Sequence, residues 1–132
     1  MNIFIDTNVF LDVVLKRENY QAGLSVLNAC GENLFQGVVS DITLLNIDYV
    51  AKKQVSDLRK FLTVINDRFV VIGADNNAFS LALETNHSDL EDVVQYGAAE
   101  RSGCELIVTN DKAFFQKDIR LISSSGFVKE FL

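Results

Sequence analysis

The sequence lacks several features that mark common classes of protein. It has one histidine and only two cysteines, Cys30 and Cys104, which are too few for a disulfide framework. We therefore expect both thiols to be buried and inert in a reducing cytoplasm. Scarce histidine and widely spaced cysteines also argue against zinc, which prefers Cys and His ligands. The chain has no proline either, and nothing about function follows from that.

No apolar run is long enough to cross a membrane. The runs at residues 69–73 and 106–108 fall far short of the ~20 residues that a transmembrane helix needs. The first residues also lack a basic segment followed by a long apolar stretch, so we expect no secretory signal. These absences predict a cytoplasmic protein that does not associate with membranes.

The motifs of several enzyme classes are missing as well. The chain has no Walker A loop and no Gly-x-Gly-x-x-Gly, so a nucleotide cofactor is not indicated. No serine lies in a Gly-x-Ser-x-Gly elbow, and we expect His87, in a polar loop, to be a surface residue rather than a general base. The net charge of −6 argues against a generic nucleic-acid coat, but not against an enzyme that acts on nucleic acid.

The segments that are present indicate an α/β fold. The chain has 132 residues, of which 48% are hydrophobic, as expected for a single domain spanning 1–132. We predict strands at 2–6, 36–39, 69–72, 106–109 and 119–122, and helices at 7–16, 21–29, 41–53, 56–66, 75–84 and 89–102, with a final helical turn at the C-terminus. This alternation predicts a three-layer α/β/α sandwich around a parallel sheet of roughly five strands.

Three aspartates are predicted near one edge of this sheet. Asp6 closes the first strand and Asp111 follows the strand at 106–109, so both lie at the carboxyl edge, where such sheets bind ligands. Asp92 lies one turn into the helix at 89–102, beside its apolar stripe. Asp89 is three residues earlier and could face the same side, whereas we expect Glu91 to face solvent.

Each of these aspartates also has a structural alternative. Asp6 could cap the helix that follows it, Asp111 could stabilise a turn, and Asp92 could interact with the helix dipole. Carboxylates gathered in one place, however, repel each other unless a positive charge lies between them. Together the three predict a site for Mg²⁺ or Mn²⁺, which are hard cations that take oxygen ligands. Lys112, next to Asp111, is the best local candidate to bind a substrate phosphate.

Four stretches of the sequence resemble the PIN-domain nucleases, and within them the VapC-like branch of toxins from toxin–antitoxin systems. In the family's order they are FIDTNVFLD (4–12), ITLLNIDYV (42–50), DLEDVVQYGAA (89–99) and LIVTND (106–111). The resemblance implies a five-stranded parallel sheet and Mg²⁺- or Mn²⁺-dependent cleavage of RNA. It also implies a small antitoxin protein and a second copy of the chain as partners.

The resemblance further assigns roles by position. The catalytic metal ligands would be Asp6, Asp92 and Asp111; Thr7, Asn8 and Thr109 would support the site, with Asp89 as an outer ligand. One position departs from the family's pattern: many members carry a glutamate where this chain has Asn46.

The departure at Asn46 leaves an alternative function open. An asparagine can offer its amide oxygen to a metal, but it is neutral and cannot act as a base. The chain could therefore be a weakly active or inactive PIN-like domain that binds a protein or RNA. A phosphatase or receiver-like domain ranks last, because Asp6-Thr7-Asn8 lacks a second aspartate two residues after the first.

Overall fold

Short apolar runs form the strands and amphipathic segments form the helices that connect them. The computed structural model describes residues 1–132. In chain order its elements are β1 (Asn2–Ile5), α1 (Thr7–Val14), α2 (Tyr20–Gly31), β2 (Gln36–Ser40), α3 (Asp41–Ala51), α4 (Leu58–Arg68), β3 (Val70–Ile72), α5 (Asn76–Glu84), α6 (Leu90–Arg101), β4 (Leu106–Val108), β5 (Arg120–Ile122) and α7 (Ser124–Phe131). Every predicted strand and helix is present within a few residues of its expected bounds. The predicted final turn is a full helix, α7.

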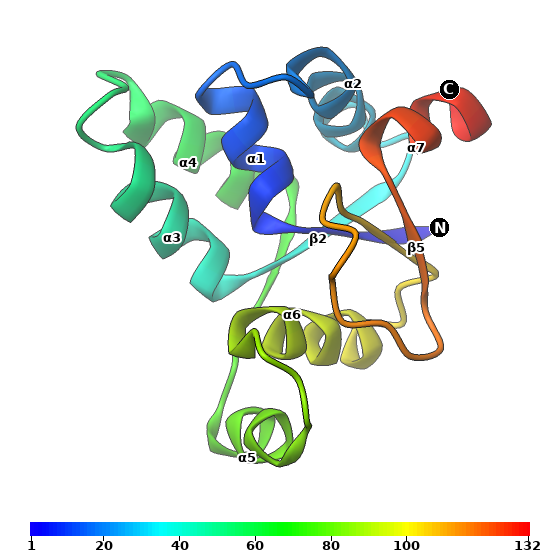
Figure 1. Cartoon of the computed structure of the whole chain (residues 1–132). Coiled ribbons are helices and arrows are strands. Elements are labelled where there is room, and N and C mark those ends of the chain that lie inside the picture. The colour runs from blue at the N-terminus through cyan, green and yellow to red at the C-terminus, as the bar shows by residue number, and fades with distance from the viewer.

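The five strands form one parallel sheet in the order β3-β2-β1-β4-β5. The central strand β1 is fully buried at Ile3, Phe4 and Ile5, as expected for a strand that helices cover on both faces. Figure 1 shows α6 beneath the sheet with α5 outside it, while α1 to α4 and α7 lie on the other side. The predicted three-layer α/β/α sandwich is therefore confirmed.

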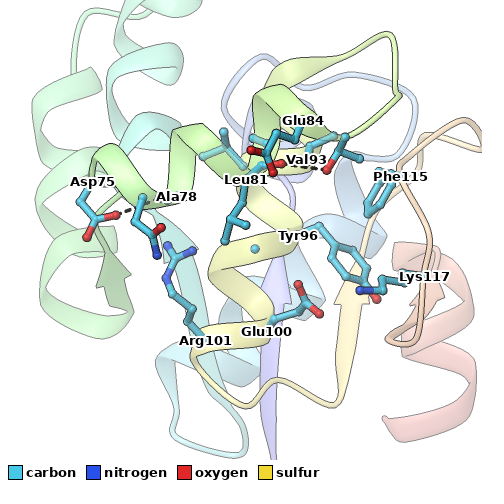
Figure 2. Close-up of a pocket in the computed structure, with 15 residues that line it drawn as sticks. Asp75, Ala78, Leu81, Glu84, Val93, Tyr96, Glu100, Arg101, Phe115 and Lys117 are labelled. Atoms are coloured by element: carbon cyan, nitrogen blue, oxygen red, sulfur yellow. Dashed lines mark hydrogen bonds between the residues drawn. The ribbon is translucent and has the colours of Figure 1, made fainter.

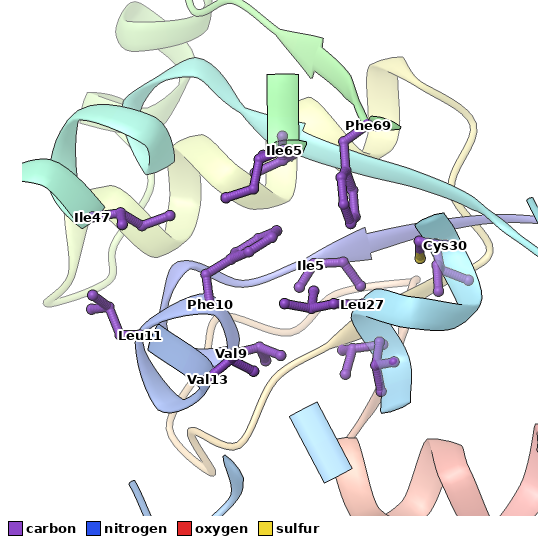
Figure 3. Packing of buried hydrophobic residues seen from close by; sticks show 14 of the residues in the cluster. Ile5, Val9, Phe10, Leu11, Val13, Leu27, Cys30, Ile47, Ile65 and Phe69 are labelled. Carbon is purple, nitrogen blue, oxygen red and sulfur yellow. The ribbon is translucent and has the colours of Figure 1, made fainter. Parts of the chain in front are cut away.

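The two faces of the sheet carry separate hydrophobic cores, because alternate residues of a strand point to opposite sides. Ile3 and Ile5 pack into the larger core, in which the rings of Phe10 and Phe69 meet edge-on with centroids 5.5 Å apart (Figure 3). Phe4 points the other way, into the core beneath α6. These cores fix α1 and α6 on opposite sides of the carboxyl end of β1.

Cys30 and Cys104 are both free and buried, as predicted. Burial raises the pKa of each thiol to about 12, so both are protonated and unreactive at neutral pH. No helix is long and apolar enough to span a membrane.

Candidate functional site

Asp6 immediately follows β1 and is the most deeply buried acid of the site. Its side chain does not cap α1, so the capping alternative is not what the structure shows. Instead, Thr109 Oγ1 donates to Asp6 Oδ2 at 2.8 Å and Gln95 Nε2 donates to Asp6 Oδ1 at 3.0 Å. Burial raises the pKa of Asp6 from 3.8 to about 6, and the charge of Glu91 adds to the rise. Two donors thus hold a carboxylate that is costly to ionise.

Asp92 lies in the first turn of α6, which Asp89 caps by accepting a hydrogen bond from the Asp92 backbone N–H at 3.3 Å. Asp92 is only 7% exposed. Burial is the main cause that raises its pKa to about 7, followed by the charges of Asp89, Asp6, Asp111 and Glu91. The neighbouring acids therefore act on Asp92 together, and a cation among them would relieve the repulsion.

Asp111 lies in the turn that follows β4. Its backbone N–H donates to Thr109 Oγ1 at 3.1 Å, and its Oδ1 accepts from the Ala113 N–H at 2.9 Å. The turn-stabilising role predicted as its alternative is therefore present. Its charge nevertheless contributes to the raised pKa of Asp92.

A cleft of about 280 Å³ opens where α3 and α6 meet the carboxyl end of β1. It is lined by Asp6, Thr7, Asn8, Leu11, Asn46, Val50, Asp89, Glu91 and Asp92. The remaining predicted residues, Thr109, Asp111 and Lys112, line a separate hollow. Asp6 and Asp92 thus share the cleft, and Asp111 lies outside it.

The donors in the cleft fit a hard cation better than a soft one. They are carboxylate, hydroxyl and amide oxygens, with no thiolate. No three Asp, Glu, His or Cys side chains form a ready-made group that could hold a metal ion. A cation held here would therefore depend on few carboxylates and on water, which is the arrangement that Mg²⁺ favours.

Glu91 does not face solvent, and that prediction was wrong. Its Oε1 accepts from Asn46 Nδ2 at 2.7 Å, and its Oε2 accepts from Thr7 Oγ1 at 2.8 Å. The face of α6 that bears Glu91 and Gln95, one turn apart, is turned toward the junction of β1 and α1. Buried hydroxyl and amide donors at this junction require acceptors, which Glu91 and Gln95 supply.

Gln95 is a site residue that sequence reasoning missed. It is fully buried, and its Oε1 accepts from the Thr7 backbone N–H at 3.2 Å. The sequence did offer one indication that Gln95 has a role in the site: it is a polar residue in an otherwise apolar stretch that includes Val93, Val94 and Tyr96.

His87 was predicted to be a surface residue, but it is half-buried. Its side chain is 20% exposed, and its Nε2 lies 3.7 Å from Asp92 Oδ2. This nitrogen is buried and has no hydrogen-bond partner. The ring meets Phe115 edge-on with centroids 5.4 Å apart, and this packing helps to keep His87 next to Asp92.

A larger hollow of about 390 Å³ lies between α5 and α6 (Figure 2). Its walls include Leu81, Val93 and Tyr96, with Glu100 and Arg101 at its edge. None of the predicted site residues lines it. Asp92 and three of the acids that raise its pKa, Asp89, Asp6 and Glu91, line the smaller cleft, which is therefore the candidate site.

The fold and the cleft define an α/β sandwich with buried acids at the carboxyl edge of a parallel sheet. The model of the PIN domain family matches residues 2–113, and the chain belongs to this family. The chain is 28% identical over 134 residues to Ribonuclease VapC1 of Aquifex aeolicus (strain VF5), with 95% of this chain and 92% of that protein covered. The family resemblance of the four sequence stretches is thus confirmed.

Solved structures share the fold at low sequence identity. A toxin–antitoxin complex from Klebsiella pneumoniae has a TM-score of 0.68 and 20% identity, covering 92% of this chain and 97% of that one. VapBC2 from Rickettsia felis, bound to a DNA fragment from its promoter, has a TM-score of 0.62 and 16% identity, covering 93% and 98%. The structure of FitAB bound to an IR36 DNA fragment has a TM-score of 0.67 and 15% identity, covering 92% and 94%.

Proposed function

We propose that this chain is a Mg²⁺- or Mn²⁺-dependent endoribonuclease and the toxin of a toxin–antitoxin pair. The nearly full-length similarity to Ribonuclease VapC1 supports the ribonuclease activity. Structural neighbours described as toxin–antitoxin and VapBC complexes support the toxin role. The observation that carries the proposal is the shared cleft of Asp6 and Asp92, two buried carboxylates whose pKa values are raised to about 6 and about 7.

Asp6 and Asp92 would hold the cation, with Asp111 as the third catalytic ligand and Asp89 as an outer one. When bound, the cation lowers the pKa of a water ligand and neutralises charge on the RNA phosphate. The fit rests on the oxygen-only donor set and on the cost of ionising Asp6 and Asp92 beside other acids.

The chain's own residues orient the site and the substrate. Thr109 and Gln95 both donate to Asp6, which stabilises the ionised carboxylate and fixes its plane. Asn46 donates to Glu91 through its Nδ2, which leaves its amide oxygen free to face the cleft. The exposed Lys112 would bind an RNA phosphate next to Asp111.

Asn46 contributes no charge, and we propose that it weakens cation binding and activity relative to an acid at that position. A cleft that binds no cation and cleaves no RNA would favour the alternative function. The chain would then be a PIN-like domain that serves as a module for binding protein or RNA.

The proposed partners are RNA, a small antitoxin protein and a second copy of the chain. The second copy is supported by α3, on which Leu45 and Tyr49 are 72% and 79% exposed although both are large and apolar. Such residues on one helix face are typical of protein interfaces. We propose that the chain acts in the cytoplasm, where its RNA substrates and its antitoxin would be found.

Cleavage of a panel of structured and single-stranded RNAs, with Mg²⁺, Mn²⁺ or EDTA, tests the proposal. We expect cleavage with either cation and none with EDTA. A parallel preparation of Asp92→Asn controls for contaminating ribonucleases, because it should be inactive under all three conditions. Metal-independent cleavage, or equal cleavage by the variant, would contradict the proposal.

A further inference from the structure

Each oxygen of the Glu91 carboxylate accepts a hydrogen bond from another element. From α3, Asn46 Nδ2 donates to Oε1 at 2.7 Å, and from the start of α1, Thr7 Oγ1 donates to Oε2 at 2.8 Å. Glu91 is therefore the point at which α1, α3 and α6 are joined across the cleft. With a short bond on each oxygen, this carboxylate is held in place rather than free to swing out and bind a cation.

A directional chain of hydrogen bonds links Glu91 to Asp6. The Thr7 hydroxyl has one proton, which goes to the charged Glu91, so the Thr43 hydroxyl, 2.8 Å away, donates to Thr7. The Thr7 backbone N–H donates to Gln95 Oε1 at 3.2 Å, which turns Gln95 Nε2 toward Asp6 Oδ1 at 3.0 Å. Glu91 thus holds the Thr7 side chain in place. Thr7 in turn orients the side-chain amide of Gln95, which donates to Asp6.

The charge in this corner of the cleft lies on residue 91 and not on residue 46. Asn46 donates to Glu91 at 2.7 Å, and a carboxylate in its place would face another carboxylate at that distance. The charge of Glu91 also reaches the proposed ligands, since it is among the causes that raise the pKa of Asp6 and of Asp92. The pair of residues 46 and 91 therefore carries a single negative charge, which lies on Glu91 of α6.

We propose that Glu91 is a positioning residue of the cation site. It supplies from α6 the negative charge that Asn46 does not supply from α3, and it holds Thr7 and Gln95 so that Asp6 faces the cation. This inference rests on the proposed cation-dependent function. The loss of an acid at position 46 is thereby offset in part.

Mn²⁺ affinity, measured by isothermal titration calorimetry, tests this role without relying on activity. Glu91→Gln keeps the shape of the side chain but removes its charge, and we expect ~10–100-fold weaker binding, the usual effect of losing an outer-shell partner. Glu91→Gln combined with Asn46→Asp moves the charge to α3 and should restore most of the affinity. Glu100→Gln, an exposed position on the same helix, should bind as the wild type does.

The outcomes separate this inference from the function on which it rests. If Glu91→Gln binds Mn²⁺ like the wild type while Asp92→Asn loses binding, Glu91 has no positioning role. If the double variant binds as weakly as Glu91→Gln, the charge-transfer claim is wrong. If the folded wild type binds no Mn²⁺, the cation-dependent function itself fails. Should Glu91→Gln not fold, as judged by melting in EDTA, the double variant decides: affinity near that of the wild type supports the inference, and its loss overturns it.

Discussion

At the residue scale, the cleft holds charge that the fold does not neutralise. Asp6 and Asp92 are buried, and the donors to the Asp6 carboxylate are the neutral side chains of Thr109 and Gln95. Neutral donors stabilise a carboxylate less than a cation does, so burial prevails and both pKa values are raised. A cation bound in the cleft should therefore favour the ionised form of both carboxyl groups and stabilise the folded protein.

Replacing either buried aspartate should abolish cleavage while preserving the fold. We expect Asp6→Asn and Asp92→Asn to lower the metal-dependent rate by more than ~100-fold, because the loss of an outer-shell partner alone costs ~10–100-fold. Single-turnover RNA cleavage measures this, with circular dichroism as the check on folding. Asp67→Asn, at an exposed site on α4, is the matched control and should retain full activity. Cleavage at the wild-type rate by Asp6→Asn would refute the assignment.

The stability of the metal-free protein should depend on pH in the direction set by these two groups. Their pKa values are higher in the folded state, about 6 and about 7, than the ordinary 3.8, so the folded state binds more protons between about pH 4 and 7. The free energy of unfolding therefore falls as pH rises through this window, by on the order of 2 kcal/mol after screening by solvent at the cleft.

Thermal melting in EDTA from pH 5 to pH 8 measures this dependence. We expect a lower Tm at pH 8, a weaker pH dependence in Asp92→Asn, and recovery of the Tm when Mn²⁺ is added at pH 8. An unchanged slope in Asp92→Asn would show that its carboxyl is not perturbed.

At the element scale, close packing beside β2 depends on Gly37. A Cβ at this position would lie 2.4 Å from the Phe69 ring and 3.0 Å from Cys30 Sγ. Phe69 is itself held edge-on against Phe10 in the larger core and has little room to move (Figure 3). The glycine is therefore required by the close approach of α2 and Phe69 to the strand.

Gly37→Ala should destabilise the fold by ~1–3 kcal/mol, the usual cost of overpacking a core. The midpoint of urea unfolding measures the change. Gly31→Ala is the matched control, because a Cβ there meets nothing within 4 Å and alanine favours helix. It should be neutral or slightly stabilising. Equal effects of the two substitutions would mean that Phe69 moves aside.

Sequence patterns predicted the elements well but predicted side-chain directions poorly. The alternation of strands and helices, and the strand-end positions of Asp6 and Thr109, follow from local periodicity and from one rule of parallel sheets. Glu91 and His87 were misplaced because their neighbours, Asn46 and Phe115, come from distant parts of the chain. Helical periodicity orients residues on one helix but does not say which other element covers each face.

At the scale of the whole molecule, the exposed apolar face of α3 should hold two copies together. We expect sedimentation velocity to give a dimer for the wild type and a monomer for Leu45→Glu combined with Tyr49→Glu. The control variant is Leu83→Glu. Leu83 is 70% exposed on α5, in the opposite layer of the sandwich, so this variant should remain dimeric (Figure 1). A wild-type monomer at tens of micromolar, or a dimer that survives the double substitution, would contradict this interface.

The central claim is that Asp6 and Asp92 hold a divalent cation in the cleft at the carboxyl end of β1. Anomalous scattering from crystals soaked in Mn²⁺ locates the ion directly. The account predicts a difference peak at coordination distance, ~2.0–2.3 Å, from oxygens of both Asp6 and Asp92. A peak elsewhere, or no peak at a soaking concentration that supports RNA cleavage, would contradict it.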